Sequence, residues 1–161
     1  MKTLWAPWRI EYILSEKPDG CIFCVPPERE NDREKLILHR TPFSFVMLNR
    51  YPYTNGHLMV APFRHTSEMT DLSDDEMLDL FRAVRLCRNV LQETASPQGF
   101  NIGINLGRAA GAGVDEHMHI HIVPRWNGDT NYMTVIGDIR VMPENLSNTY
   151  EKLLPGFPVP R

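Results

Sequence analysis

Residues 117 to 126 read HMHIHIVPRW, so half of the six histidines of the chain stand at alternate positions of one short segment. In a β-strand, residues two apart point to the same face and lie roughly 6.5–7 Å from one another. The alternation predicts a strand with His117, His119 and His121 on one face and apolar side chains on the other. We expect this strand to close at Pro124, because proline has no N–H for the ladder. Three imidazoles on one face carry six ring nitrogens that need partners, which indicates a functional site.

Length and charge limit the class of protein. The chain has 161 residues, and we expect a single domain over residues 1–161 with an N-terminal arm at 1–20 and a C-terminal extension at 127–161. The formal net charge of −3 argues against a basic surface for a nucleic-acid polymer. No apolar run has the length of a membrane span, and the opening MKTLWAPWRIEYIL lacks the apolar core of a signal peptide. We therefore expect a cytoplasmic protein without a nucleic-acid or membrane partner.

Five segments have strand-like patterns and are joined by short connections or by one helix. They cover residues 36–39, 43–49, 57–63, 100–105 and 117–123. The turn residues Asn55-Gly56 predict that the second and third of these segments form a hairpin. Such an order favours a mainly antiparallel sheet.

Two helices are predicted after the hairpin. Ser73-Asp74-Asp75-Glu76 has the pattern of a capping box, and Pro97 marks the end of the long helix that it opens. The apolar residues of this helix recur at spacings of three and four, at Met77, Leu80, Phe81, Val84, Cys87 and Leu91. Pro143-Glu144 predicts the start of a short final helix that ends at about Leu154. The fold class is therefore α+β, with one long helix and a short C-terminal helix packed on a five-stranded sheet.

A glycine-rich loop, LGRAAGAG, precedes the histidines at residues 106–113. Small residues let backbone N–H groups approach a ligand closely, and successive N–H groups can bind an anion. A phosphate bound there would meet an imidazole, and a neutral histidine is a nucleophile near pH 7. The pattern favours attack of a histidine on phosphorus through a phosphoramidate intermediate.

The pair Cys21-x-x-Cys24 predicts a metal site. Its spacing recurs in structural zinc sites, which need four protein ligands, and an odd total of three cysteines does not suggest a disulfide framework. The histidines that could complete such a site are His57, His65, His117 and His121. A redox-active dithiol is the alternative, but no βαβ pattern surrounds the pair.

With these motifs in view, the chain resembles the histidine triad (HIT) superfamily, whose signature of histidines alternating with apolar residues matches residues 117–123. Residues 49–52 and 56–60 resemble the upstream hairpin of that family, and the loop at 105–113 resembles its phosphate loop. The resemblance covers residues 21–126 and implies a HIT-like fold.

The resemblance also implies a role for each matching residue. His119 matches the nucleophile that attacks the α-phosphate of a nucleotide, and His121 matches the third histidine of the triad, near the phosphate. The nucleotide-binding positions of the family match Asn49, Asn105, Gly107, Gly111, Ala112, Gly113 and His121. The ligands of a structural zinc ion in zinc-containing relatives match Cys21, Cys24, His65 and His117. His57 would then be a buried, hydrogen-bonded support residue.

One branch of the superfamily matches best. Many HIT hydrolases and phosphoramidases carry Gln followed by Ser or Thr where this chain has Ala112-Gly113. The start LWAPWR and the tail at 124–132 instead resemble a bacterial branch associated with diadenosine tetraphosphate phosphorylase activity. The resemblance thus implies a nucleotidyl transferase or hydrolase that cleaves dinucleoside polyphosphates through a nucleotidyl-histidine. It further implies small nucleotides such as AMP, ATP or diadenosine polyphosphate as partners, Mg²⁺ with the polyphosphate, and a homodimer or higher homo-oligomer.

Three alternatives stay open. A purine nucleoside phosphoramidase or a dinucleoside polyphosphate hydrolase of the same superfamily would use the same nucleophile. A hydrolytic zinc ion on all three histidines would leave an open position for water, and chelation would then abolish the chemistry. A nucleotide-binding module with a relic site would bind mononucleotides without turnover.

Overall fold

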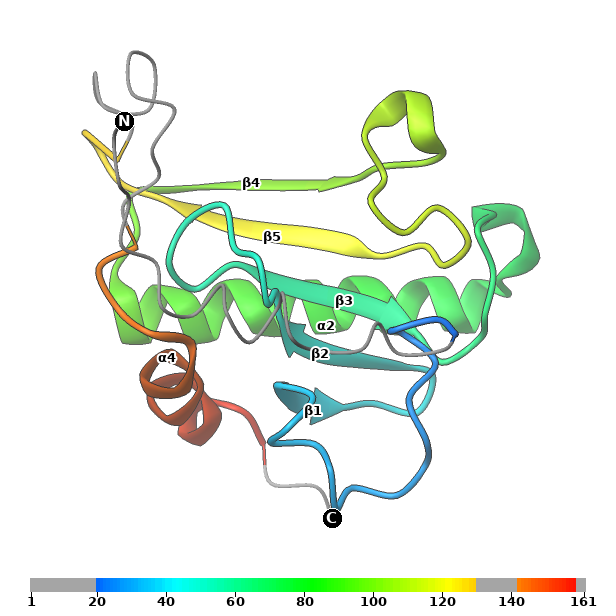
Figure 1. The fold of residues 1–161 in the computed structure, drawn as a ribbon, viewed down its shortest axis with the longest axis horizontal. Helices are drawn as coiled ribbons and strands as arrows, with labels where there is room; N and C mark the ends of the chain where they lie inside the picture. Colours follow the sequence, from blue (N-terminus) through cyan, green and yellow to red (C-terminus); the bar gives the residue numbers. More distant parts are fainter. Residues whose placement is uncertain (1–19, 130–141, 159–161) are drawn as a thin grey trace, which may run out of the picture.

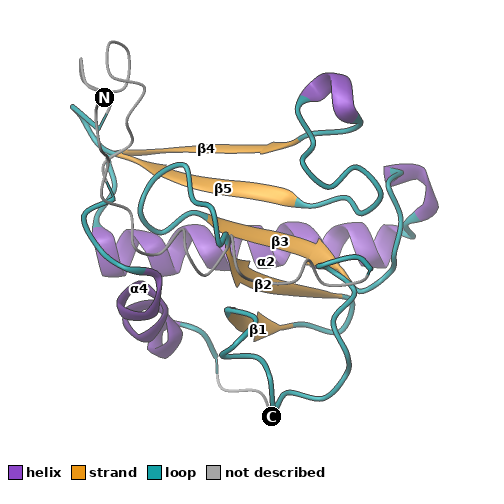
Figure 2. Ribbon diagram, viewed as in Figure 1, coloured by secondary structure: helices purple, strands orange, loops and turns teal. Residues whose placement is uncertain are grey.

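The computed structural model describes residues 20–129 and 142–158. Five strands form one antiparallel sheet in the order β1-β2-β3-β5-β4 (Figure 1). The strands are β1 (Ile37–Arg40), β2 (Ser44–Leu48), β3 (Leu58–Pro62), β4 (Gly99–Ile104) and β5 (Ile120–Arg125). Together with two α-helices in the described ranges, α2 (Asp74–Ala95) and α4 (Leu146–Leu153), they confirm the predicted α+β fold (Figure 2).

Helix α2 runs along one face of the sheet (Figure 1). Its capping box has the predicted form, because the Ser73 hydroxyl accepts the Glu76 N–H and the Glu76 carboxylate accepts the Ser73 N–H. The helix ends at Ala95, and Ser96 adopts a left-handed conformation just before Pro97. Most predicted core positions of this helix are buried, but Phe81 is 52% exposed, since it lies outside the stripe that contacts the strands.

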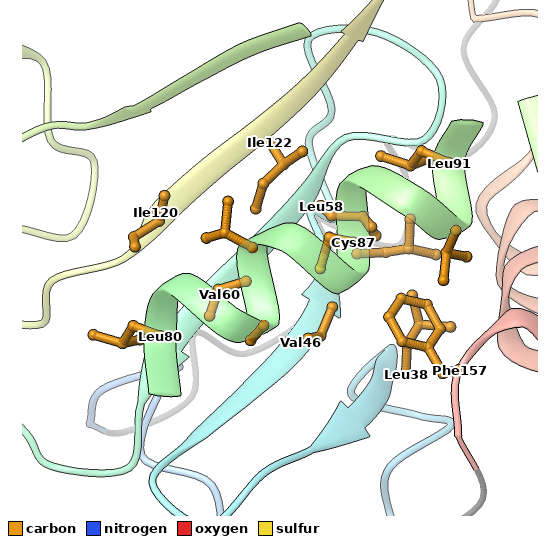
Figure 3. Close-up of a cluster of buried hydrophobic side chains, with 14 of the residues drawn as sticks. Leu38, Val46, Leu58, Val60, Leu80, Cys87, Leu91, Ile120, Ile122 and Phe157 are labelled. Atoms are coloured by element: carbon orange, nitrogen blue, oxygen red, sulfur yellow. The ribbon is translucent and has the colours of Figure 1, made fainter. Parts of the chain in front are cut away.

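The apolar core lies between α2 and the sheet (Figure 3). Alternate residues of β2, β3 and β5 point into it, namely Val46, Leu48, Leu58, Val60, Ile120 and Ile122. Cys87 of α2 is fully buried in the same core, and this burial raises the pKa of its thiol far above the ordinary range. Cys87 is thus core filling, as the helical spacing predicted.

A smaller apolar cluster lies on the opposite face of the sheet. We call it the Phe45 cluster, and its buried members are Phe23, Ile37, Phe45, Met47, Met59 and Ala61. Side chains alternate along β2 and β3, so residues between those of the main core necessarily point to this second face. Met59 pairs with His121 across the β3–β5 ladder, which extends this face to the histidines.

The histidine segment differs from its prediction at both ends. β5 begins only at Ile120, so His117, Met118 and His119 precede the strand, and the Met118 N–H donates to the Thr66 carbonyl instead of to a ladder partner. The strand continues through Pro124 to Arg125. A proline is tolerated there because the ladder with β3 ends at Ile122, which leaves only β4 beside β5.

The final helix begins later than predicted. Asn145 caps α4 by accepting the Asn148 N–H at 2.8 Å, so the helix starts at Leu146 and Pro143 lies before it. The side-chain oxygen of an N-cap residue accepts a backbone N–H that has no partner within the helix, and a proline side chain cannot do this. The Tyr150 hydroxyl donates to the Ile37 carbonyl at 2.9 Å, which fixes α4 against the sheet.

The predictions for the two ends of the chain lie largely outside the described residues. The aromatic N-terminal arm falls almost entirely on residues 1–19, and much of the C-terminal extension falls on 130–141; the structure describes neither range. Within residues 20–129 and 142–158, none of the helices has both the length and the apolar character that spanning a bilayer requires.

Candidate active site

His119 stands immediately before β5 and is buried. Its Nδ1 lies 3.0 Å from the His117 carbonyl oxygen. A carbonyl oxygen can only accept, so Nδ1 carries the proton and donates it. In the neutral ring, Nε2 then keeps its lone pair. The fold thus leaves a lone pair on His119 Nε2, which a nucleophilic imidazole requires.

His121 is oriented by a chain of hydrogen bonds that begins at the backbone. The Tyr53 N–H donates to His57 Nδ1 at 3.1 Å, and the His57 Nε2 lies 2.9 Å from His121 Nδ1. Because His57 Nδ1 accepts, the proton of the neutral His57 ring is on Nε2, and Nε2 donates to His121. His121 then carries its own proton on Nε2. The two neighbouring histidines therefore offer opposite groups, a lone pair on His119 and an N–H donor on His121.

The electrostatic environment keeps both rings neutral. Burial lowers the pKa of His119 below its ordinary value. Burial and the neighbouring His119 lower the pKa of His121 to about 4. The rings of His119 and His121 meet edge to face with centroids 4.7 Å apart, so protonation of both would place two cations in contact. Near pH 7 the pair is thus uncharged, with a lone pair on His119 and an N–H donor on His121.

The four residues predicted to bind metal lie together although they come from three parts of the chain. The ligand atoms of Cys21, Cys24, His65 and His117 all lie within 4.8 Å of one another. The Cys21 Sγ and the Cys24 Sγ lie 3.4 and 4.0 Å from His117 Nδ1, and the Cys24 Sγ lies 3.3 Å from His65 Nδ1. We call these four residues the metal cluster.

This cluster fits a zinc ion by distance and by tautomer. Zn–S bonds of about 2.3 Å and Zn–N bonds of about 2.0 Å at tetrahedral angles put sulfur and nitrogen about 3.5 Å apart. Two of the three separations, 3.4 and 3.3 Å, are close to this value, and the third is 4.0 Å. His117 Nε2 lies 2.9 Å from the Pro62 carbonyl and so donates to it, which leaves the Nδ1 lone pair on the side of the cysteines. Burial and the Cys21 thiol raise the pKa of Cys24, and a divalent cation would reverse this by stabilising both thiolates.

The predicted nucleotide-binding residues lie on two sides of these histidines. The Asn49 side chain accepts the Tyr51 N–H at 2.8 Å and points its amide at His57 Nδ1, 3.4 Å away, so it lies beside the His57–His121 pair. Asn105 directly follows Ile104, which pairs with Ile120, and His119 directly precedes Ile120. Asn105 and His119 therefore leave the ladder at the same end of the sheet. A ribose contact by either asparagine stays a prediction.

The glycine-rich loop after β4 is exposed (Figure 1, the yellow-green loop). Gly107 and Gly111 adopt positive φ values of 77° and 88° around a 3₁₀ turn, Arg108–Ala110, which explains glycine at both positions. Ala112 and Gly113 continue the loop toward the histidines. Phosphate binding by these four residues stays a prediction.

Two aromatic residues of the site were missed by sequence reasoning. Phe23 stacks on the His119 ring with centroids 4.5 Å apart, and the Tyr53 ring lies 4.6 Å from His57 and 5.7 Å from His121. An aromatic residue inside the Cys-x-x-Cys spacing was the available signal for Phe23. For Tyr53 the available signal was its place in the predicted turn, four residues before His57.

The chain is similar to known enzymes and to a zinc-bound structure. The HIT domain family matches residues 29–128. AP-4-A phosphorylase of Mycobacterium tuberculosis is 38% identical over 157 residues, covering 92% of this chain and 80% of the relative. The asymmetrical bis(5'-nucleosyl)-tetraphosphatase of Schizosaccharomyces pombe is 38% identical over 93 residues, covering 58% of this chain and 50% of the relative.

Among solved structures, a zinc-bound histidine triad family protein from Mycobacterium smegmatis has a TM-score of 0.65 and 25% identity, covering 85% of this chain and 92% of that one. The family match covers most of the chain, and its range contains the His119–His121 pair, His57 and the glycine-rich loop. The fold and the sequence agree, and the chain belongs to the HIT domain family.

Proposed function

We propose that the protein cleaves dinucleoside polyphosphates, with diadenosine tetraphosphate as the substrate, by way of an adenylyl group on His119. The observation that carries this proposal is the fixed tautomer of His119, whose Nδ1 donates to the His117 carbonyl and whose Nε2 keeps its lone pair. The relatives named as AP-4-A phosphorylase and as tetraphosphatase support the substrate class.

In the first step, the Nε2 lone pair of His119 attacks the α-phosphorus. A P–N bond forms, the bond from phosphorus to the bridging oxygen breaks, and ATP leaves. A polyphosphate leaves as a stable anion, so this step needs no acid in the position of Ala112-Gly113. The adenylylated imidazole is a cation, and its Nδ1–H still donates to the His117 carbonyl, whose oxygen carries partial negative charge.

His121 assists by hydrogen bonding and not by proton donation. Its pKa of about 4 keeps the ring neutral, and the Tyr53–His57 chain directs a proton to Nε2. An N–H group aimed at the phosphoryl oxygens stabilises the charge that grows on them in the transition state. Backbone N–H groups of residues 107–113 would add to this effect, with Asn49 and Asn105 on the ribose.

The second step regenerates His119. An oxygen of inorganic phosphate attacks the adenylyl phosphorus, the P–N bond breaks, and ADP is released; water in place of phosphate would give AMP. The phosphorylase relative aligns with 92% of this chain and the tetraphosphatase relative with 58%. We therefore propose phosphate as the acceptor.

We propose that the metal cluster holds a structural zinc ion. The sulfur–nitrogen separations and the His117 tautomer support this assignment, as does the zinc-bound relative. A zinc ion there would stabilise two thiolates and join residues 21–24 to the segment before β5. A Mg²⁺ ion on the polyphosphate stays a prediction without support from the protein's own residues.

The test is product analysis by chromatography after incubation with diadenosine tetraphosphate, with and without orthophosphate, for the wild type and for His119→Ala. We expect ADP and ATP only with phosphate, and loss of turnover by about 10⁴-fold in the variant. AMP and ATP regardless of phosphate would identify a hydrolase instead. An unaltered rate in His119→Ala would exclude the nucleotidyl-histidine.

Two additional measurements, a comparison with adenosine phosphoramidate as substrate and detection of adenylyl-protein, separate the remaining alternatives. A purine nucleoside phosphoramidase would cleave an adenosine phosphoramidate much faster than the tetraphosphate. A hydrolytic zinc ion on the three histidines would form no adenylyl-protein. Its geometry is disfavoured, since His117 Nδ1 faces the cysteines while His119 Nδ1 bonds to a carbonyl. A nucleotide-binding module would retain nucleotides without any turnover.

We also propose that residues 1–161 form a single cytoplasmic domain that assembles as a homodimer. β4 is last in the strand order, and its described residues pair with β5 alone, while Ile102 on it is 46% exposed. An exposed edge strand of this kind is suited to pairing with a second copy. Sedimentation velocity of the wild type and of Ile102→Lys tests the assembly, and a monomeric wild type would contradict it.

A further inference from the structure

Phe23 lies between the two cysteines of the metal cluster, and its side chain is only 1% exposed. Its ring stacks on the imidazole of His119, with centroids 4.5 Å apart and planes inclined by 26°. The same ring lies 5.5 Å from that of His117, tilted by 50°. One buried side chain thus contacts both the proposed nucleophile and a proposed metal ligand.

The segment that carries Phe23 has few backbone restraints of its own. Residues 20–28 form turns and bends without a helix or strand, in which the Cys24 N–H donates to the Cys21 carbonyl and the Val25 N–H donates to the Phe23 carbonyl. Phe23 itself packs in the Phe45 cluster, and the two cysteines belong to the metal cluster. The Arg40 guanidinium donates to the Pro26 and Glu28 carbonyls, which holds the far end of the segment and not the cysteines. The position of the Phe23 ring therefore depends on how both cysteines are bound.

A second link joins the metal cluster to the same imidazole. His117 offers its Nδ1 lone pair to the metal cluster, and its carbonyl oxygen accepts the His119 Nδ1–H at 3.0 Å. The face of the His119 ring is thus held by a residue between two metal ligands, and its Nδ1 edge is held by a third ligand. Loss of either contact would let the ring turn about its side-chain bonds.

We propose that Phe23 is a positioning residue that couples binding of zinc at Cys21 and Cys24 to the orientation of the His119 imidazole. This inference rests on the proposed function, in which His119 Nε2 attacks phosphorus. With the cysteines joined to His117, the loop is fixed and the Phe23 ring stays stacked on His119. In-line attack requires the lone pair to point at phosphorus, and a small misplacement of a reacting group costs a large factor in rate.

The experiment compares two leucine substitutions in one apolar cluster of the zinc-loaded protein. Phe23→Leu removes the ring that stacks on His119. Phe45→Leu removes an equally buried ring of the Phe45 cluster, which stacks on Phe63 instead, with centroids 5.5 Å apart. Both variants lose similar volume, so Phe45→Leu controls for a general loss of packing. Phe23→Met provides a second ring-free variant if Phe23→Leu does not fold.

The first readout is kinetic. In single turnover with diadenosine tetraphosphate, we expect the rate of adenylyl transfer to His119 to fall about 10- to 100-fold in Phe23→Leu, with the KM changed about twofold or less. In Phe45→Leu we expect a rate within about twofold of the wild type. A change in rate without a change in KM is the signature of a misplaced reacting group.

The second readout does not require activity. Nitrogen-15 spectra of the histidine rings report which nitrogen of His119 carries the proton, and competition with a chelator gives the zinc dissociation constant. We expect a single Nδ1–H form of His119 in the wild type and in Phe45→Leu, and a mixture of tautomers in Phe23→Leu. Removal of zinc from the wild type should produce the same mixture, and Phe23→Leu should bind zinc at least about threefold more weakly.

An unchanged His119 spectrum in Phe23→Leu and in the zinc-free wild type would overturn the inference, whatever the rates. Equal effects of Phe23→Leu and Phe45→Leu on the spectrum would overturn it too, because Phe23 would then be ordinary packing. If the wild type forms no adenylyl-His119, the proposed function fails, but the spectra and the zinc constants still decide whether Phe23 couples the two sites.

Discussion

The two faces of the sheet use the same three strands for different purposes. On the α2 face, Val46, Leu58 and Ile122 are fully buried among apolar neighbours. On the opposite face, Met59 pairs across the ladder with His121, and the Phe45 cluster gives way to histidines and cysteines. One face is stabilised by burial of apolar area, and the other depends on polar groups that each need a partner.

The difference teaches how a small domain keeps polar chemistry beside its core. A buried imidazole without a partner would cost a few kcal/mol, about as much as an apolar truncation. The structure meets this cost with carbonyl acceptors for His117 and His119 and with the Tyr53–His57 chain for His121. The polar face is therefore stable only as a complete network, whereas single residues of the apolar face act more independently.

Removal of zinc should have one of the largest effects on stability. The ion would bind the folded metal cluster, and at a free concentration a thousandfold above its dissociation constant it stabilises the folded state by about 4 kcal/mol. We expect chelation to lower the free energy of unfolding by about this amount, measured by denaturant titration with and without zinc. Cys21→Ser should respond far less to added zinc. Equal unfolding curves for the chelated and zinc-loaded wild type would show that a metal ion does not stabilise the polar face.

Truncation of one residue on each face should separate stability from activity. Ile122→Ala and Met59→Ala remove buried side chains at neighbouring positions of the β3–β5 ladder, on opposite faces. Each should lower the free energy of unfolding by about 2–5 kcal/mol. Only Met59→Ala, beside His121, should reduce turnover per folded molecule by more than about twofold. A similar loss of turnover in Ile122→Ala would show that the α2 face also positions the histidines.

The sequence predicts the division between the faces because alternation is a local property. The positions of Ile120, His121 and Ile122 follow from a period of two, and Ser73 with Glu76 predicts the start of α2; the structure agrees on both. The turn of His117 away from the strand depends on a hydrogen bond from Met118 to Thr66, far apart in sequence. No local pattern contains such a contact.

The same reasoning explains the contacts that were missed. The stacking of Phe23 on His119 joins residues 96 positions apart, and its geometry depends on the placement of an irregular loop against the sheet. Pro124 inside β5 is allowed only because β3 ends earlier than β4 does along that strand. The family resemblance predicted which residues form the metal cluster. The tautomer of His117 depends on a tertiary contact with the Pro62 carbonyl, which no local pattern contains.

Acid should weaken the polar face more than the apolar one. The pKa of His121 is lowered to about 4 in the folded protein, against about 6.5 in an unfolded chain. Between these values the unfolded chain binds a proton that the folded protein does not, so the free energy of unfolding falls as pH decreases from about 6.5 toward 4.

The matched variant for this test is His121→Asn, which removes the titrating group and keeps a polar side chain. Denaturant titrations of zinc-loaded protein at pH 7 and pH 5 should show a larger loss of stability in the wild type than in the variant. The partial exposure of His121 keeps this difference below the effect of the core truncations. If both proteins lose the same amount, His121 does not titrate differently in the folded and unfolded states.

The smallest effect on stability is expected in the glycine-rich loop, which lies outside the sheet. Arg108 and Asp115 form an ion pair at 2.6 Å, but the arginine side chain is 86% exposed, so water and salt screen the pair. Arg108→Ala should leave the free energy of unfolding unchanged within the error of the measurement, with Arg33→Ala, from another exposed pair, as the matched control. Denaturant titration at low and high salt measures both. A clear loss of stability in Arg108→Ala alone would mean that the loop stabilises the histidine face before any nucleotide binds. The division between a stabilising face and a chemical face would then extend beyond the sheet.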